Sequence, residues 1–262
     1  VRVNALPRVA DGRREFVVVR SQRNMYDRAL LVAGGQLVEV GVADRYSGPG
    51  VRDAAAWEIE AAIGPRTAGV YYLAGAQSRP GLRDVVAAAR AHGVPVLVDA
   101  AAQLPPAENL RRFIDQGADL VCFSGGKALG GPQASGILAG RADLVASALL
   151  QMLDLDVYDD LWAPPAEFAA LGQLRGLPHH GIGRSCKLGK EEIAGLCMAL
   201  RRFVAEDPAA RQRRWLAVLA ALREAAGLDG LRLEVGRIPH LALECGSAAA
   251  AGTGALDLAA SA

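Results

Sequence analysis

Long apolar runs are missing from this sequence of 262 residues, although 52% of its residues are hydrophobic. The longest apolar stretch extends from roughly Leu144 to Leu150. A membrane-spanning helix needs roughly 18 or more such residues in succession. The sequence therefore predicts no membrane span, and the hydrophobic residues are expected to fill the core of a soluble protein.

Paired cysteines are also missing. The four cysteines, Cys122, Cys186, Cys197 and Cys245, stand far apart and form no CxxC motif. This spacing excludes a zinc cage and a disulfide framework. The opening residues lack the basic, apolar and small-residue regions of a secretory signal. Together these absences favour a reducing cytoplasm as the location.

An excess of charge of one sign is the third absence. There are 29 Lys and Arg residues against 28 Asp and Glu, so the formal net charge is +1. No broad basic face for a nucleic-acid backbone and no acidic tail is indicated, and a nucleic-acid partner is not expected. The length allows one large or two small domains.

Short apolar runs alternate with stretches of helical period, which is typical of βαβ units around a mostly parallel sheet. The fold class predicted is therefore α/β. The predicted strands are Phe16 to Val19, Gln36 to Val40, Gly69 to Leu73, Pro95 to Val98, Leu120 to Phe123 and Ala134 to Leu138. The predicted helices between them are Met25 to Val32, Asp53 to Ile63, Leu82 to Ala91 and Ala107 to Gln116. Strands buried on both faces should be continuous apolar runs.

Helical patterns dominate after Arg141. A first helix to about Leu153 is followed by an irregular stretch with Pro164, Pro165, Pro178, His179 and His180, which is expected to be a loop or lid. Two more helices are predicted at Lys190 to Ala205 and Pro208 to Ala226, then strands at Leu231 to Val235 and His240 to Glu244. We expect a large domain at 1–150 and an incomplete α+β domain at 151–262. The Ala-rich tail from Ser247 to Ala262 is given no function.

A carboxylate stands at the end of a predicted strand. Asp99 ends the apolar run VLVD, and ligands of open α/β sheets bind at the carboxyl ends of strands. The structural alternative, that Asp99 caps a helix beginning near Pro105, has about even weight for an isolated aspartate.

A lysine follows the next predicted strand. Lys127 lies among Ser124, Gly125, Gly126 and Gly130, where glycine lets the backbone approach a ligand. A lysine beside an apolar wall supplies the neutral amine that forms Schiff bases. A Walker phosphate loop does not match, because Ala128 stands where Ser or Thr would hold magnesium. An Asp and a Lys on neighbouring strand ends suit pyridoxal phosphate, whose ring nitrogen pairs with an acid.

These residues carry a family resemblance. The segments VDAAAQLPPAENLRRFIDQGADLVCF, SGGKALGGPQASGILAGRADL and GIGRSCKLGKEEIAGL, in this order, resemble the SelA-like branch of fold-type-I pyridoxal-phosphate enzymes. That branch includes D-glucosaminate-6-phosphate ammonia-lyase and, more distantly, L-seryl-tRNA(Sec) selenium transferase. The likeness covers most of the chain from about Leu6 to Ala226.

The resemblance implies roles for individual residues. By it, Lys127 is the Schiff-base lysine, Asp99 the partner of the ring nitrogen, Ser124 a phosphate ligand and Gln103 a contact to the phenolic oxygen. Gln22 occupies a position where relatives place a histidine over the cofactor face, and glutamine stacks less well there. The resemblance also implies a homo-oligomer.

The sequence departs from the family pattern in two further places. Relatives carry an N-terminal glycine-containing loop that holds the cofactor phosphate. This sequence starts after the place of that loop, and the small domain stops early, so a fragment is expected. The turn after the third strand reads AGAQSRP, which puts substrate contacts from Gln77 or Ser78 in doubt.

Charged residues after the irregular stretch have two interpretations. Arg184 is a candidate for binding an anionic substrate group, and Lys187 is a weaker one; both also suit a solvated loop and helix start. His179 and His180 resemble metal ligands, but no acid or cysteine stands at ligand spacing, so no metal is expected. Asp27 is interpreted as a helix-start residue at least as readily as an active-site one.

The sequence favours the first of three functions, and the other two are alternatives. The first is a pyridoxal-phosphate-dependent lyase that removes water and ammonia from a 2-amino-3-hydroxy acid, free or phosphorylated, such as D-glucosaminate 6-phosphate. The second is a selenium transferase that acts on seryl-tRNA. The third is an inactive scaffold that binds the cofactor weakly.

Overall fold

The computed structural model describes residues 3–8, 12–42, 53–76, 78–171, 174, 180–227 and 230–243. The chain forms two compact units, Val1–Arg201 and Arg202–Ala262. No helix in these described ranges is both long and apolar enough to cross a membrane. The domain division expected near residue 150 stays a prediction.

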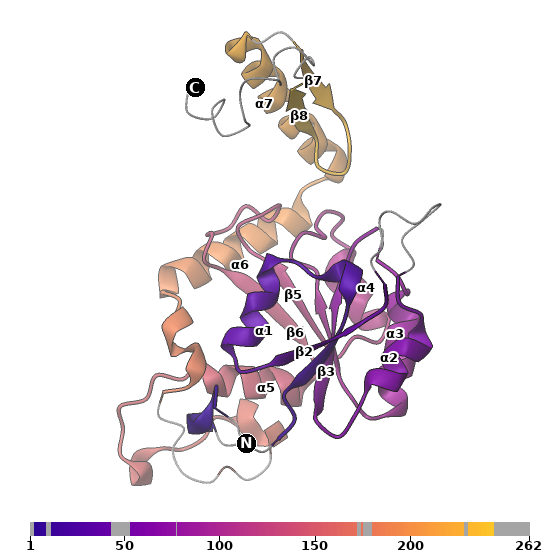
Figure 1. Cartoon of the computed structure of the whole chain (residues 1–262). Helices are drawn as coiled ribbons and strands as arrows, with labels where there is room; N and C mark the ends of the chain where they lie inside the picture. Colours follow the sequence, from indigo (N-terminus) through magenta and orange to yellow (C-terminus); the bar gives the residue numbers. More distant parts are fainter. Residues whose placement is uncertain are drawn as a thin grey trace, which may run out of the picture. The chain divides into compact units, whose positions relative to one another are not determined.

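The first unit is built on a six-stranded sheet with the order β2-β1-β3-β4-β5-β6 (Figure 1). Its strands are β1 (Glu15–Val19), β2 (Gln36–Val40), β3 (Thr67–Leu73), β4 (Val96–Asp99), β5 (Leu120–Ser124) and β6 (Gly136–Gly140). Adjacent strands from β2 to β5 pair in parallel, and β6 pairs antiparallel with β5. The α/β class with a mostly parallel sheet is confirmed.

Valine-rich runs make the central strands the core of this unit. Val17, Val18, Val98 and Val121 are fully buried, because helices cover the central strands and leave no solvated face. The edge strand β6 differs from these strands, because its residues alternate between exposed and half-buried. Its sequence, GILAG, begins and ends with glycine and is not the continuous apolar run expected of a strand buried on both faces.

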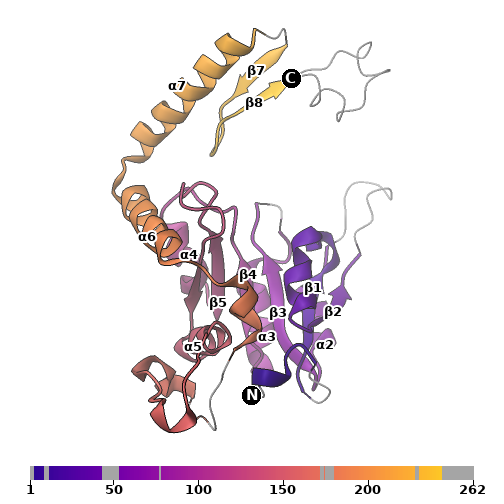
Figure 2. The same ribbon diagram turned by 90° about the vertical axis from the view of Figure 1, so that its left-hand side faces the viewer.

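The first four α-helices connect the parallel strands, and two more follow β6 (Figures 1 and 2). They are α1 (Arg28–Val32), α2 (Ala56–Ala62), α3 (Leu82–Ala91), α4 (Asn109–Asp115), α5 (Ala142–Gln151) and α6 (Lys190–Ala205), with 3-10 turns η1 (Val3–Ala5), η2 (Arg20–Gln22), η3 (Met25–Asp27), η4 (Asp159–Leu161), η5 (Ala166–Leu171) and η6 (Ile182–Cys186). The predicted bounds of α3 and α6 are confirmed.

The helix expected at Met25 to Val32 is divided. A 3-10 turn at its start is capped by Asn24, whose Oδ1 accepts a hydrogen bond from the Tyr26 N–H at 2.8 Å. The Asp27 carboxylate accepts one from the Asn24 N–H at 3.1 Å, which completes a capping box. The helix-start role of Asp27 is therefore confirmed, and the α-helix begins only at Arg28.

Helix α5 and the segment after it lie at the end of the sheet where the parallel strands begin (Figures 1 and 2). The antiparallel pairing explains this position, since the end of β6 at Gly140 lies opposite Leu120, the start of β5. Ala146 and Leu150 of α5 pack there against Phe168 of η5.

The second unit contains α7 (Pro208–Ala226), β7 (Leu231–Glu234) and β8 (His240–Leu243). Asp207 caps α7, and Gly227 ends it in the left-handed conformation at φ 59°. Its predicted bounds are confirmed, and β7 and β8 form an antiparallel pair. The predictions for Gln77, Pro178, His179, Cys245 and the tail lie outside the described residues.

Candidate active site

The ends of four parallel strands form the candidate site. β1, β3, β4 and β5 end at one edge of the sheet: Asp99 is the last residue of β4, and Gln22, Ala74 and Lys127 follow β1, β3 and β5 respectively. Leu73 is in register with Asp99, and Asp99 is in register with Cys122 of β5. The parallel topology thus brings the predicted carboxylate and the predicted lysine to adjacent strand ends.

Asp99 is half-buried and held by two donors. Its Oδ2 accepts a hydrogen bond from the Tyr71 hydroxyl at 2.8 Å, and its Oδ1 accepts one from the Ala101 N–H at 2.9 Å. The alternative that Asp99 caps the following helix is wrong, because that helix begins at Asn109 and the capped group belongs to a turn. Asp99 therefore does not cap a helix, and it lies at the carboxyl end of β4.

The groups around Asp99 are neutral. Burial raises the pKa of Tyr71, and the hydrogen bond to Asp99 raises it further. Burial also raises the pKa of the Cys122 thiol to about 11, and the charge of Asp99 adds to this effect. Both neighbours therefore stay protonated at neutral pH.

Lys127 stands on a tightly packed turn after β5. A Cβ on Gly125 would lie 2.1 Å from the Ser135 Oγ, and one on Gly126 would lie 2.6 Å from the Gln133 Cα. The turn is closed by the Gly130 N–H, which donates to the Lys127 carbonyl at 2.9 Å. Glycine is required here because only it allows this close approach.

The side chain of Lys127 is exposed. Its Nζ lies 5.7 Å from the centre of the Tyr26 ring, which is itself 67% exposed. The apolar wall expected beside this lysine is therefore not found among the described residues. The amine is instead accessible from the strand-end edge.

Ser124 and Gln103 lie at the same edge. Ser124 is the last residue of β5, three positions before Lys127. The Gln103 amide donates from Nε2 to the Ala74 carbonyl at 2.6 Å, and the Asn109 amide donates to the Gln103 carbonyl at 2.6 Å. Gln103 thus links the turn after β4 to the end of β3, and its cofactor contact stays a prediction.

Gln22 joins the end of β1 to the end of β3. It is 4% exposed; its Oε1 accepts from the Leu73 N–H at 3.0 Å and its Nε2 donates to the Arg79 carbonyl at 3.2 Å. Both ends of the amide are used by backbone groups. Its role as a cofactor contact stays a prediction, while its structural role is evident.

Sequence reasoning missed a charged network beside this edge. Arg23 forms ion pairs with Asp27 and with Glu39 of β2. Asp27 is 2% exposed, and its Oδ1 has no hydrogen-bond partner. The sequence signal for this network was the Arg23-Asn24 pair followed by Asp27. The ion pair between Arg23 and Glu39 of β2 could not be predicted without the fold.

Arg184 does not lie with Lys127 and Asp99. The Arg184 Nε pairs with the Asp154 Oδ1 at 2.9 Å, and Lys187 contacts the other oxygen of Asp154. These two cations lower the pKa of Asp154, with the Lys187 hydrogen bond as the larger cause. The cluster follows α5, at the end of the sheet opposite the carboxyl edge (Figures 1 and 2).

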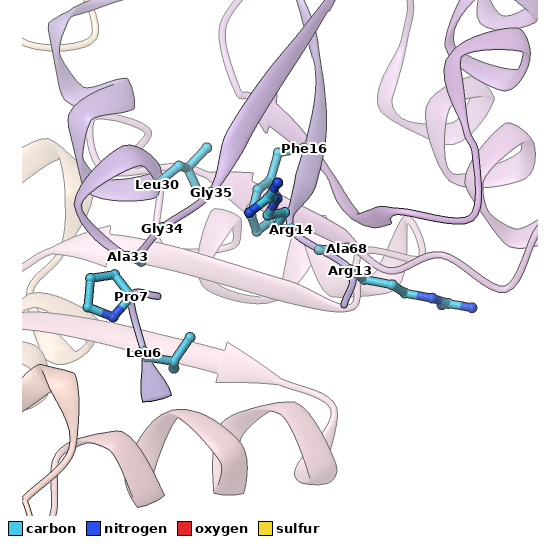
Figure 3. Close-up of a pocket in the computed structure, with 10 residues that line it drawn as sticks. All are labelled: Leu6, Pro7, Arg13, Arg14, Phe16, Leu30, Ala33, Gly34, Gly35 and Ala68. Atoms are coloured by element: carbon cyan, nitrogen blue, oxygen red, sulfur yellow. The ribbon is translucent and has the colours of Figure 1, made fainter. Parts of the chain in front are cut away.

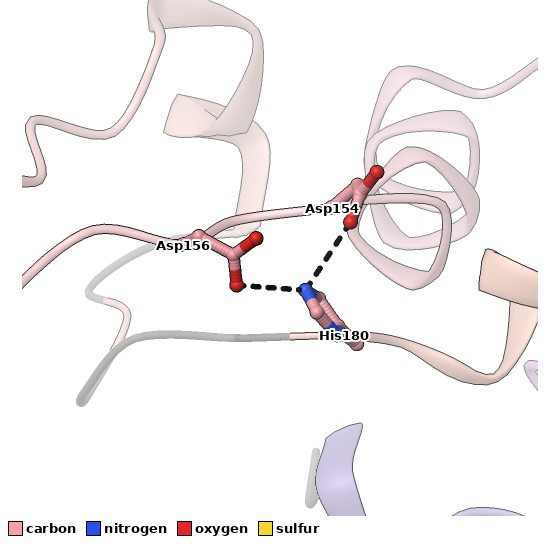
Figure 4. Close-up of side chains that lie close together, drawn as sticks. All are labelled: Asp154, Asp156 and His180. Atoms are coloured by element: carbon pink, nitrogen blue, oxygen red, sulfur yellow. Dashed lines mark ion pairs between the residues drawn. The ribbon is translucent and has the colours of Figure 1, made fainter.

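His180 gains acidic neighbours that the sequence spacing did not indicate. Its Nε2 lies 3.2 Å from Asp154 and 3.5 Å from Asp156 (Figure 4). Within the described ranges this is the one group of three candidate metal ligands. Because Arg184 and Lys187 already neutralise Asp154, the arrangement is an ion-pair cluster rather than a ready cation site.

A pocket of about 170 Å³ lies elsewhere, at the beginning of the strands (Figure 3). Pro7 lies beside Gly34 there, and Phe16 and Leu30 contribute apolar wall. A Cβ on Gly34 would lie 2.2 Å from the Pro7 carbonyl, so the N-terminal segment packs closely on this glycine. The pocket does not include Asp99 or Lys127.

The donor set at the strand-end edge fits pyridoxal phosphate. Asp99 offers a carboxylate held in place by two donors, and Lys127 offers an accessible primary amine. These are the two groups that the cofactor needs, one for its ring nitrogen and one for its aldehyde. The entire sequence has two other lysines: Lys187, which contacts Asp154, and Lys190, which begins α6.

Comparisons with known proteins show which family the chain resembles. The chain matches the family model described as SelA, L-seryl-tRNA selenium transferase, over residues 27–156. It is 34% identical to 5'-C-glycyluridine monooxygenase-decarboxylase from a Streptomyces species, over 99% of this chain and 59% of that protein. D-Glucosaminate-6-phosphate ammonia lyase from Salmonella typhimurium is 30% identical, over 77% of this chain and 46% of that protein.

A solved structure extends the likeness to the fold. The structure of D-glucosaminate-6-phosphate ammonia-lyase superposes with a TM-score of 0.56 at 27% identity and covers 85% of this chain and 51% of that chain. The chain spans about half the length of the curated relatives it matches.

The fold places the chain in the fold-type-I class of pyridoxal-phosphate proteins. Within that class, the chain belongs to the SelA-like family. Pyridoxal phosphate is the cofactor that the family and the donor set indicate.

Proposed function

We propose that this chain carries the catalytic centre of a pyridoxal-phosphate-dependent lyase acting on a small 2-amino-3-hydroxy acid. The observation that supports it most directly is the placement of Asp99 and Lys127 at adjacent strand ends in a chain 30% identical to an ammonia lyase. A phosphorylated amino-sugar acid such as D-glucosaminate 6-phosphate is the first substrate to test.

The names of the relatives support this substrate class. D-Glucosaminate, a seryl group and 5'-C-glycyluridine each denote an amino-acid carbon next to a carbon that bears a hydroxyl. The chemistry common to them begins at the α-carbon. In a lyase, the hydroxyl group on the neighbouring carbon then leaves.

The residues of this chain have distinct tasks in that reaction. When bound, pyridoxal phosphate supplies a sink for the electron pair left at the substrate α-carbon. Asp99 keeps a negative charge beside the ring nitrogen and so favours its protonated form. The Lys127 amine takes the α-proton, and its rigid turn fixes the position of that amine.

The overall reaction balances without an oxidant. Water lost with the β-hydroxyl is regained in the hydrolysis that releases ammonia, so the net products are a 2-keto-3-deoxy acid and ammonia. The second candidate is oxidative decarboxylation, which the 34% identity over 99% of the chain favours. That reaction consumes dioxygen and releases carbon dioxide.

Product analysis separates these candidates. D-Glucosaminate 6-phosphate and free 2-amino-3-hydroxy acids are incubated with the chain and pyridoxal phosphate under air and under nitrogen. The lyase releases ammonia and a 2-keto acid equally in both. If carbon dioxide is released under air but not under nitrogen, the proposed function changes from a lyase to a decarboxylating monooxygenase. If the absorbance spectrum of pyridoxal phosphate is the same with and without the chain, the chain does not bind the cofactor and the inactive scaffold is favoured instead.

The transferase alternative finds less support in the surface charges. Arg211 is 3% exposed and pairs with Glu206, Arg214 pairs with the same carboxylate, and Arg213 lies 3.8 Å from Asp207. The main arginine cluster of the second unit is thus largely neutralised. A tRNA backbone needs unpaired cations on a broad surface.

A further inference from the structure

Tyr71 approaches Asp99 from the neighbouring strand. It lies on β3 two residues before Leu73, the residue in register with Asp99, so its side chain extends toward the carboxyl edge. Tyr71 is 6% exposed, and its hydroxyl donates to the Asp99 Oδ2 at 2.8 Å. A buried side chain of one strand thereby holds the carboxylate of the next.

The contact determines how Asp99 is presented. The Ala101 N–H binds Oδ1 at 2.9 Å and Tyr71 binds Oδ2, so both oxygens have a partner on the protein. Two donors, one on each oxygen, fix the rotation of the carboxylate plane. Each oxygen keeps a further lone pair for a cationic ligand.

The donor does not lose its proton under ordinary conditions. Burial is the main cause that raises the pKa of Tyr71, followed by the Asp99 hydrogen bond. Burial also keeps the nearby Cys122 thiol neutral. Tyr71 is therefore the donor of the hydrogen bond, and the Asp99 Oδ2 accepts it.

We propose that Tyr71 is a positioning residue that holds Asp99 as an oriented carboxylate for the ring nitrogen of the cofactor. The inference rests on the cofactor site of the proposed function and adds a residue to it. In this proposal Tyr71 acts through Asp99, the group to which its hydroxyl donates.

Two probes isolate this role. Pyridoxal phosphate and an analogue with carbon in place of the ring nitrogen are titrated into the chain, and the dissociation constant of each is measured. The analogue offers Asp99 no nitrogen to pair with. The variants are Tyr71→Phe, Asp99→Ala, and the matched control Tyr72→Phe, which removes a hydroxyl of similar burial from the same strand without touching Asp99.

The expected pattern is selective. Tyr71→Phe weakens binding of pyridoxal phosphate roughly tenfold to a hundredfold, the range for a hydrogen bond to a charged group, and leaves the affinity for the analogue unchanged. Tyr72→Phe changes the ratio of the two affinities by less than about twofold. Adding Tyr71→Phe to Asp99→Ala produces no further loss.

Two results would overturn the inference. Equal weakening of both probes by Tyr71→Phe would make Tyr71 a merely structural residue, while the cofactor site remained. An unsubstituted chain that does not prefer pyridoxal phosphate to the analogue would contradict the pairing of Asp99 with the ring nitrogen, and the role of Tyr71 with it. Neither result depends on which substrate the enzyme uses, so the reaction is tested separately.

Discussion

Asp99 and Lys127 show what single residues contribute and what they need from their neighbours. The sequence identified both from their positions after apolar runs, because strand ends and glycine-rich turns have local signatures. It did not identify Tyr71, which lies inside the apolar run TAGVYYL and looks like an ordinary core residue. Its hydrogen bond to Asp99 depends on the register between β3 and β4, which the sequence pattern does not contain.

Replacement of Asp99 should separate cofactor attachment from reactivity. In Asp99→Ala, Lys127 is unchanged and still forms a covalent adduct with the cofactor. Loss of the charged contact to the ring nitrogen should slow α-proton exchange roughly tenfold to a hundredfold or more. Exchange is measured by deuterium incorporation into serine. Undiminished exchange would show that another group protonates the ring.

The thiols should differ in their reaction with iodoacetamide. The raised pKa of Cys122, about 11, leaves little thiolate near pH 8, whereas Cys186 and Cys197 are exposed. We expect mass spectrometry to find the two exposed cysteines modified first at pH 8. Modification of Cys122 should accelerate as the pH rises toward 11. Equal rates at pH 8 would contradict the half-buried position and the raised pKa of Cys122.

At the scale of elements, local signals predicted whole helices and buried strands better than their junctions. The bounds of α3 and α6 follow from amphipathic spacing, and those of α7 follow from its end signals, Asp207 and Gly227. The 3-10 turn before α1 depends on a capping box whose strength local propensity does not reveal. The edge position of β6 is a property of the assembled sheet.

The Gly125 turn should be sensitive to one added methyl group. Gly125→Ala would place a Cβ 2.1 Å from the Ser135 Oγ and 2.9 Å from the Ser135 carbonyl, so the turn that carries Lys127 must shift. We expect cofactor attachment to fall at least about tenfold, since a misplaced amine no longer meets the aldehyde. Gly64→Ala is the control, because no atom lies within 4 Å of its added Cβ. Equal attachment in both variants would contradict the required close packing.

Gln22 should stabilise the connection between β1 and β3. Gln22→Ala leaves the Leu73 N–H without its partner, at a cost of about 1 to 3 kcal/mol in the free energy of unfolding. Gln36→Ala at the exposed start of β2 is the matched control and should cost less than about 0.5 kcal/mol. Urea denaturation measures both. A Gln22→Ala variant as stable as the control would show that the two backbone contacts carry little free energy.

At the scale of the whole molecule, different groups of residues lie at the two ends of the sheet. The carboxyl end gathers Asp99, Lys127 and the Arg23 network, whereas the other end holds the Asp154 cluster and the pocket beside Gly34. The sequence predicted the first group, since the resemblance and the strand-end rule agree on it. It grouped Arg184 with that site, but the structure pairs Arg184 with Asp154 at the other end.

The central claim is that Lys127 carries the cofactor, and three lysines in the sequence make a direct measurement possible. The chain is mixed with pyridoxal phosphate, reduced with borohydride, digested and mapped by mass spectrometry. A Lys127→Arg variant serves as the control and keeps Lys187 and Lys190 as competing amines. The account predicts a pyridoxyl group on Lys127 that disappears in the variant. A label on Lys187 or Lys190 in place of Lys127, or equal labelling of the variant, would contradict it.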